Sequence, residues 1–305
     1  MNPTSAARRL SLFAVLAFAA AFTVLSQSGR AQMGMAPSGM LEVGGAKLFY
    51  KSQGSGEPLL LIHGYPLSGE LFKNNRAALS RRFRVITMDL RGFGKSSAPT
   101  ADPGSIETYA SDALALMDAL KIDKAVIGGM SMGGPIAFEI YRRAPERVRG
   151  LILITTLANP AGTVEKAIWG GMARKATDHG AASLVPELMK DMLTGRTQSR
   201  RPALVANLVG VISGASVRGD VAGAMALADR PDSLPTLATV RVPTLILAGG
   251  EDTVYPPVFS LKMQQGIAGS KLVVIPGASH AAIIEAAPAA NRAILAWAAQ
   301  LPIAK

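Results

Sequence analysis

Ser131 has the surroundings of a catalytic nucleophile. Residues 129–133 read Gly-Met-Ser-Met-Gly, an apolar run at 125–127 precedes them, and a helix-like segment that begins near Pro135 follows them. A serine hydroxyl reacts poorly unless a sharp strand-to-helix turn holds it clear of its neighbours beside a base. Glycine on both sides lets the strand and the helix approach each other closely. The pattern predicts a nucleophile, provided that the chain supplies its partners.

A serine nucleophile needs a general base, and the chain has three histidines. His63 directly follows the apolar run 59–62, so we expect it to shape the loop that must turn there. His179 lies between Asp178 and Gly180 in a helical stretch, where an exposed helix-end histidine is expected. His280 follows the last apolar run, and open α/β sheets place their sites at the carboxyl ends of strands. We predict that His280 is the base.

An acid must orient the histidine and stabilise its charged form without taking its proton. Asp252 follows the apolar run 244–248 and two glycines, on a loop from which a carboxylate can reach an imidazole on the next loop. Glu251 is the alternative, because it lies one residue earlier on the same loop. Position matters more than residue type here, and we favour Asp252.

The developing oxyanion of a reacting carbonyl needs fixed hydrogen-bond donors. The backbone N–H of Met132, at the predicted start of a helix, is one such donor, and the helix dipole favours negative charge there. The loop after residue 62 offers a second donor. Pro66 has no N–H, so the backbone N–H of Tyr65 is the best placed.

The elements that must position these residues follow from the apolar pattern. Two strands at 40–43 and 47–51, around Gly44 and Gly45, predict an opening hairpin. Short apolar runs then alternate with helical stretches such as 106–120, which predicts an α/β fold with a mainly parallel sheet flanked by helices. The predicted strands lie at 59–62, 85–88, 125–127, 151–154, 244–248 and 272–275.

The alternation of strands and helices is interrupted between residues 159 and 235, where helical stretches occur without a strong strand. We interpret residues 159–235 as an inserted helical cap and residues 40–158 and 236–305 as the core. Residues 32–39 form a Gly, Met and Pro linker.

Residues 1–31 are typical of a cleavable export signal. Arg8 and Arg9 precede an apolar run that ends at Leu25, shorter than the ~20 residues that cross a bilayer, and Ala31 is the expected cleavage position. We therefore expect a periplasmic or secreted protein without a stable membrane span after signal removal. The paired arginines favour twin-arginine export only weakly.

Composition narrows the chemistry further. The chain has no cysteine, which excludes disulfides, thiol catalysis and cysteine-ligated zinc. Its net charge is +11, and the densest basic cluster, residues 196–201, has no interleaved aromatic residues. We interpret that cluster as a solvated face and expect no nucleic-acid partner.

Several motifs together resemble the α/β-hydrolase superfamily over nearly the whole chain after the signal. Residues 63–66 resemble its oxyanion loop, residues 89–96 its Asp-x-Arg-Gly-x-Gly-x-Ser segment, residues 249–252 its acid loop and residues 277–280 its histidine loop. The chain order serine, acid, histidine is the order of that superfamily. The resemblance implies a triad of Ser131, Asp252 and His280 that requires neither a cofactor nor a metal. Asp89 and Arg91 are then expected to brace a loop.

Residues 225–233 and 132–134 are similar to those of esterases, enol-lactonases and cofactor-free haloperoxidases of that superfamily. The resemblance implies hydrolysis of a small carboxylic ester or lactone through an acyl-enzyme on Ser131. A perhydrolase that uses the same triad and a non-catalytic ligand-binding protein are the alternatives. Haloalkane dehalogenase and epoxide hydrolase reactions are disfavoured, because they need a carboxylate at the nucleophile position.

Apolar side chains are candidates for the substrate pocket. Trp169, Met172, Met189 and Met192 could line an acyl pocket, although apolar helical residues more often belong to a core. Met130 and Met132, next to the nucleophile, indicate an apolar entrance.

Overall fold

All eight apolar segments predicted to be strands form strands of one sheet. The computed structural model describes residues 38–98 and 104–301, and the predicted signal, the first part of the linker and the cleavage position lie outside these residues. The strands are β1 Ser38–Val43, β2 Ala46–Gln53, β3 Glu57–Ile62, β4 Phe83–Met88, β5 Ala125–Met130, β6 Val148–Ile154, β7 Thr244–Gly249 and β8 Lys271–Ile275.

The sheet has the order β1-β2-β4-β3-β5-β6-β7-β8. The pairs from β4 to β8 are parallel, whereas β2 pairs antiparallel with both β1 and β4. The predicted hairpin and the predicted mainly parallel sheet are both confirmed. Because parallel strands share one direction, the loops that follow β3, β5, β7 and β8 meet at one edge of the sheet.

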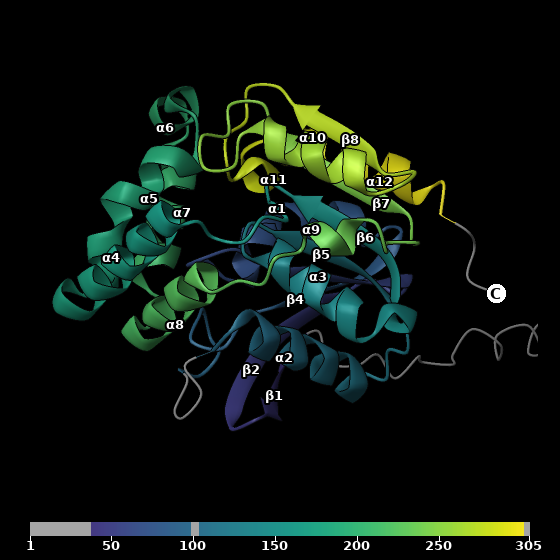
Figure 1. Cartoon of the computed structure of the whole chain (residues 1–305), viewed down its shortest axis with the longest axis horizontal. Coiled ribbons are helices and arrows are strands. Elements are labelled where there is room, and N and C mark those ends of the chain that lie inside the picture. Colours follow the sequence, from purple (N-terminus) through teal and green to yellow (C-terminus); the bar gives the residue numbers. More distant parts are fainter. Residues whose placement is uncertain (1–37, 99–103, 302–305) are drawn as a thin grey trace, which may run out of the picture. The chain divides into compact units, whose positions relative to one another are not determined.

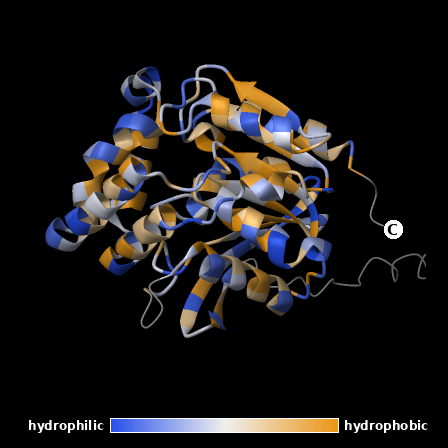
Figure 2. Cartoon of the chain, in the orientation of Figure 1, coloured by the Kyte–Doolittle hydropathy of each residue, from blue (hydrophilic) through white to orange (hydrophobic). Residues whose placement is uncertain are grey.

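The central strands are buried on both faces, as continuous apolar runs require. Leu60, Ile62 and Ile127 belong to one hydrophobic core, whereas their strand neighbours Leu61 and Val126 belong to a second core. Successive side chains of a strand point to opposite faces of the sheet, which explains this division. In Figure 2 the central strands are mostly hydrophobic, and blue residues occur along the surrounding helices.

Helices cover both faces of this sheet (Figure 1). Residues of α2, α3 and α10 contribute to the first core, and residues of α1, α11 and α12 contribute to the second. The helices are α1 Lys73–Leu79, α2 Ile106–Ala119, α3 Gly133–Arg143, α4 Thr163–His179, α5 Val185–Met192, α6 Gly195–Arg200, α7 Pro202–Ser213, α8 Val217–Ala228, α9 Leu234–Leu237, α10 Pro257–Gly266, α11 Ala282–Glu285 and α12 Ala287–Ala298. Short 3₁₀ helices are η1 Gly69–Phe72, η2 Pro145–Arg147 and η3 Ala181–Leu184.

The long connection between β6 and β7 contains only helices. Residues 155–243, all of which the structure describes, hold η3 and α4 to α9 and no strand. Helices α4 to α8 gather to one side of the sheet in Figure 1, and α4 packs against α8. Over the described ranges no single helix is long and apolar enough to cross a membrane, and only α7 and α8 together, bent by 93°, meet the length and composition.

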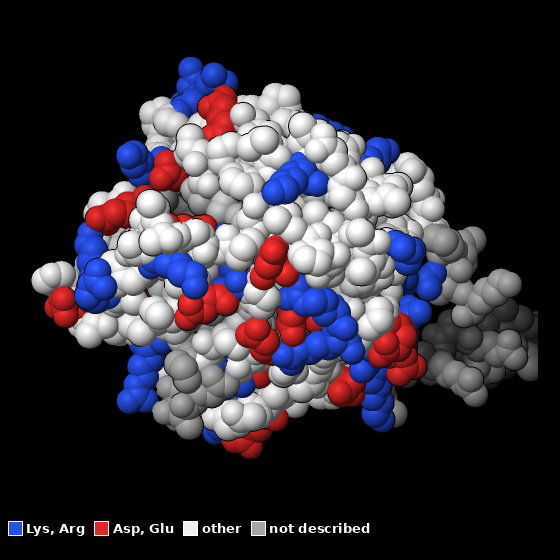
Figure 3. All heavy atoms as spheres, in the orientation of Figure 1, with Lys and Arg blue, Asp and Glu red and all other residues white. Residues whose placement is uncertain are grey.

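Charged side chains of both signs occur together on one face of the molecule. On the face in Figure 3, Lys and Arg lie close to Asp and Glu over much of the surface. The arginine-rich segment predicted to be solvated forms α6, where Arg196 and Arg200 are exposed. That prediction is confirmed.

Candidate active site

Ser131 lies at the turn between β5 and α3. Its φ is +52°, a left-handed conformation that costs energy for a residue with a side chain. Glycines allow the chain to close this tightly. A Cβ built on Gly129 would lie 2.0 Å from the carbonyl oxygen of Gly133, and one built on Gly133 would lie 2.4 Å from that of Ile62. The predicted sharp strand-to-helix turn is therefore present.

Ser131, His280 and Asp252 form one chain of hydrogen bonds. His280 Nε2 lies 2.9 Å from Ser131 Oγ, and His280 Nδ1 lies 3.0 Å from Asp252 Oδ2. The three residues are 7%, 2% and 4% exposed, respectively. Three loops thus bring together a hydroxyl, an imidazole and a carboxylate, although Ser131 lies 149 positions from His280 and Asp252 lies 28 positions from it.

The loops around these three residues fix the positions of Asp252 and His280. Asp252 Oδ1 accepts hydrogen bonds from the backbone N–H groups of Val254 (2.9 Å) and Tyr255 (3.0 Å). The ring of Tyr255 packs edge-on against the imidazole of His280, with ring centroids 5.4 Å apart. Glu251 is exposed, and only its backbone makes hydrogen bonds, to Ala278 and Ser279. The carboxylate that meets His280 is therefore that of Asp252.

Within the described ranges, neither of the other two histidines bonds to Ser131 or Asp252. His63 is fully buried, its Nε2 accepts a hydrogen bond from the backbone N–H of Leu90 (2.9 Å), and its Nδ1 lies 2.8 Å from Gly64 O. Burial lowers the pKa of His63, against the smaller raising effects of the Gly64 carbonyl and the Asp89 charge. A neutral ring that joins the loops after β3 and β4 is the loop-shaping role predicted. His179 is exposed at the end of α4, also as predicted.

The loop after β3 lies against the Ser131 turn. A Cβ built on Gly64 would lie 2.8 Å from both Ser131 Cβ and Met130 Sδ. Within the described ranges, neither the backbone N–H of Tyr65 nor that of Met132 donates a hydrogen bond to another group of the chain. The two predicted donors are therefore not used by the described part of the chain itself.

Asp89 and Arg91 brace the loop after β4, as the sequence predicted. Asp89 accepts hydrogen bonds from the backbone N–H groups of Gly69 (2.7 Å) and Lys95 (2.8 Å). Arg91 donates two hydrogen bonds to Asp112, at 2.7 Å and 2.6 Å. None of these side chains reaches the triad.

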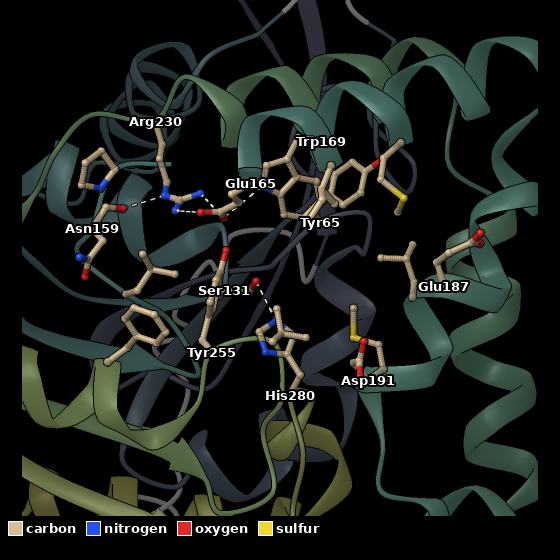
Figure 4. Close-up of a pocket in the computed structure, with 18 residues that line it drawn as sticks. Tyr65, Ser131, Asn159, Glu165, Trp169, Glu187, Asp191, Arg230, Tyr255 and His280 are labelled. Atoms are coloured by element: carbon tan, nitrogen blue, oxygen red, sulfur yellow. Dashed lines mark hydrogen bonds and ion pairs between the residues drawn. The ribbon is translucent and has the colours of Figure 1, made fainter. Parts of the chain in front are cut away.

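A cavity of about 550 Å³ opens beside Ser131 and His280 (Figure 4). Trp169, Met172 and Met192 line it, as proposed for an acyl pocket, but Met189 does not. Met189 packs instead into the second core. The remaining apolar lining comes from Leu157, Pro160, Ile168, Leu188, Val254 and Phe259.

The predicted apolar entrance at Met130 and Met132 is wrong. Both side chains are fully buried, Met130 in the second core and Met132 in the first. The turn presents Ser131 to the cavity and directs its two neighbours to opposite sides of the sheet.

Polar residues in the cavity wall were not foreseen from the sequence. Arg230 donates two hydrogen bonds of 2.6 Å to Glu165, and both residues line the cavity together with Tyr255, Asn159, Glu187 and Asp191. Tyr255 carried a signal, since it lies three residues after the acid. Arg230 lies in the segment 225–233 that resembles other esterases, but nothing in the sequence pairs it with Glu165, because only the packing of α4 near the segment after α8 brings the two together. Within the described ranges no cluster of three His, Asp or Glu side chains suits a metal ion.

Comparison with known proteins places this geometry among related folds. A model of the alpha/beta hydrolase fold matches residues 57–287. A putative non-heme chloroperoxidase from Synechocystis sp. is 33% identical over 250 residues, covering 77% of this chain and 88% of that protein. A thermophilic esterase from Thermogutta terrifontis superposes with a TM-score of 0.82 at 33% identity, covering 86% of this chain and 97% of that chain. The enol-lactonase from Burkholderia xenovorans superposes with a TM-score of 0.81 at 28% identity, covering 86% and 100% of the two chains.

Proposed function

The chain belongs to the alpha/beta hydrolase fold family, and on that premise we propose that it is a serine hydrolase of small carboxylic esters or lactones. The observation that carries this proposal is the hydrogen-bonded chain from Asp252 through His280 to Ser131, which ends in a largely apolar cavity. The esterase and the enol-lactonase named above support the substrate class.

The proposed reaction follows from the three side chains. Ser131 Oγ attacks the ester carbonyl while His280 Nε2 takes the hydroxyl proton, and Asp252 holds the Nδ1–H and stabilises the imidazolium. The backbone N–H groups of Tyr65 and Met132 donate to the oxyanion. His280 then gives the proton to the leaving alcohol, and a water molecule that His280 deprotonates releases the acid from Ser131.

Replacement of the nucleophile tests this proposal. Ser131→Ala should reduce kcat for p-nitrophenyl butyrate by roughly 10⁶-fold and abolish labelling by a fluorophosphonate, because the acyl-enzyme cannot form. Circular dichroism should show an unchanged fold. Full activity of Ser131→Ala would refute the assignment. Wild-type protein that binds ligands without turnover or labelling would instead be a non-catalytic binding member of the family.

Two histidine variants provide the matched control. His280→Ala should lose activity on the scale of Ser131→Ala, because residues of a triad act as a unit. His179→Ala should retain activity, since His179 is exposed at the end of α4. Equal losses in the two variants would contradict the role of His280.

A second candidate function is perhydrolysis, in which hydrogen peroxide replaces water and the acyl-enzyme yields a peracid. The similarity to a putative non-heme chloroperoxidase favours it. The rates of ester hydrolysis and of peroxide-dependent halogenation, measured at the same concentration of ester or carboxylic acid, distinguish the two functions. A far faster perhydrolysis would displace ester hydrolysis as the main reaction.

The position of the protein in the cell is a separate proposal. We propose that residues 1–31 direct export to the periplasm or the medium. We also propose, as a separate point, that residues 159–235 form a cap over the site.

An amino terminus at Gln32 in protein recovered from cells supports export and cleavage. Recovery of only the intact amino terminus argues against them.

A further inference from the structure

Arg230 and Glu165 form an ion pair in the cavity wall. Arg230 is buried, with its side chain 1% exposed, and its guanidinium also donates to the backbone oxygens of Asn159 (2.8 Å) and Leu227 (3.1 Å). Its positive charge is therefore already matched by a carboxylate within the protein. Arg230 is the only Lys or Arg among the described residues that line the cavity.

Glu165 keeps hydrogen-bonding capacity toward the cavity. Its Oε1 accepts from Arg230 and from Trp169 Nε1 (3.2 Å), whereas its Oε2 accepts only from Arg230. A carboxylate oxygen accepts two hydrogen bonds, so Oε2 can take one more donor. The side chain of Glu165 is 31% exposed, and the residue lines the cavity.

Tyr255 supplies a hydroxyl near this pair. The residue is 7% exposed and lines the cavity, and within the described ranges its backbone N–H bonds to Asp252 whereas its hydroxyl makes no hydrogen bond. Burial raises the pKa of Tyr255. The positive charge of Arg230 opposes this increase, and the negative charge of Glu165 adds to it. Figure 4 shows Tyr255, Glu165 and Arg230 on the side of the cavity opposite Glu187 and Asp191. The hydroxyl is thus a neutral donor beside a fixed acceptor.

We propose that Tyr255 and Glu165 form a polar subsite that recognises a neutral substrate group able both to accept and to donate a hydrogen bond. This inference rests on the proposed esterase or lactonase function and narrows its substrate class. The preferred substrates are neutral esters or lactones whose non-reacting end carries a hydroxyl or a secondary amide. A hydroxyl oxygen accepts from Tyr255, and its proton is donated to Glu165 Oε2.

The same arrangement disfavours substrates with a second carboxylate. The cavity offers such a group no uncompensated cation. Of its three carboxylates, Glu165 is paired with Arg230 and Glu187 with Lys175, whereas Asp191 makes no ion pair among the described residues. Like charges in a partly desolvated cavity repel each other more strongly than in water. An anionic ester should therefore be a poorer substrate than its neutral counterpart.

A set of methyl esters of equal length tests the subsite in the wild-type protein. The esters carry an ω-hydroxyl, ω-acetamido, ω-methoxy, ω-methyl or ω-carboxylate group on hexanoate, octanoate and decanoate chains. A methoxy group accepts from Tyr255 but cannot donate to Glu165. The best hydroxyl or acetamido ester should exceed its methoxy partner in kcat/KM by roughly tenfold, and the methoxy ester should exceed the alkyl ester by a similar factor. The carboxylate ester should be the poorest.

Tyr255→Phe removes the hydroxyl and keeps the ring that packs on His280. The ratio of kcat/KM for the methoxy ester to that for the alkyl ester should fall to about one. A merely structural role would lower both values by the same factor and leave the ratio unchanged. Tyr141→Phe is the matched control, because its hydroxyl bonds to Thr239 and Arg241 outside the cavity. That variant should keep the wild-type ratio.

The measured kcat/KM values decide whether Tyr255 and Glu165 form the proposed subsite. Equal kcat/KM for the hydroxyl, methoxy and alkyl esters at every length would overturn it, as would a preference for the carboxylate ester. So would an unchanged methoxy-to-alkyl ratio in Tyr255→Phe. In these cases hydrolysis of the alkyl ester with labelling of Ser131 would leave the proposed function standing. Absence of both hydrolysis and labelling would overturn the function and the subsite together.

Discussion

At the scale of single residues, one position along the acid loop decides the proposed chemistry. Asp252 and Glu251 are adjacent, yet only Asp252 turns inward and contacts His280. Two backbone N–H groups bind the Asp252 carboxylate and fix its orientation. An acid that orients an imidazole must itself be held in one position, and these two hydrogen bonds hold it.

Amide variants of these two acids should therefore differ strongly. Asp252→Asn should reduce kcat by roughly 10⁴-fold, because an amide cannot stabilise the imidazolium and favours the wrong tautomer of His280. Glu251→Gln should remain close to wild-type activity, since its carboxylate makes no contact with the triad. Steady-state kinetics on p-nitrophenyl butyrate compare them. The reverse ranking would place the acid one residue earlier.

At the scale of elements, the β5–α3 turn depends on glycine at positions where backbones meet. The Cβ of any other residue at position 129 would overlap the carbonyl of Gly133. Backbone atoms cannot yield as the end of a flexible side chain does, so the turn itself would have to open. In helix α4, by contrast, a Cβ on Gly171 would meet no atom within 4 Å.

These two glycines should respond oppositely to alanine. Gly129→Ala should lower the free energy of unfolding by roughly 1–3 kcal/mol or more through overpacking. Gly171→Ala should raise it by roughly 0.5–1 kcal/mol, because alanine restricts the unfolded chain and favours the helix. Urea unfolding monitored by circular dichroism measures both. Equal stability of the Gly129→Ala variant and the wild type would show that the turn tolerates a side chain there.

At the scale of the whole molecule, α8 carries a buried acid and packs against the loops that follow β3 and β4. Asp220 is 0% exposed, and neither of its carboxylate oxygens has a hydrogen-bond partner among the described residues. Burial raises the pKa of Asp220 to about 7 from its ordinary value of 3.8. Burial also raises the pKa of Tyr65, and the charge of Asp220 adds to that increase. At pH values between these two, the folded protein therefore holds a proton on Asp220 that the unfolded chain releases.

This raised pKa predicts a pH-dependent stability. The contribution of Asp220 is fully present below about pH 4 and is lost as pH rises toward 7, by up to roughly 1.4 kcal/mol per pH unit. Asp220→Asn removes this dependence, because an amide does not titrate. The unfolding free energy of the wild type should therefore fall relative to that of the variant between pH 5 and 7. Above pH 7 the difference between the two should stay constant. Parallel profiles of the two proteins would contradict the prediction.

Much of the fold and the proposed triad was predictable from sequence, because the relevant signals are local. A run such as Leu59 to Ile62 is apolar at every position, as a strand buried on both faces requires, and it is too short for a buried helix. Once the strands are parallel, their carboxyl ends meet, so Ser131, Asp252 and His280 must lie near one edge. Their chemistry and order along the chain needed no further structural knowledge.

The tertiary structure decided how side chains face one another where segments without strong periodicity meet. In the folded protein Asp252 contacts His280 and Glu251 does not, Met130 and Met132 lie in the two cores, and Met189 lies outside the cavity lining. The tertiary structure also joined Glu165 to Arg230 across 65 positions of sequence. Such contacts depend on the rotation and packing of helices α4 to α8, which a local pattern does not encode. The sequence by itself thus determined where the chemistry lies, and the packed helices decided what the cavity presents to a substrate.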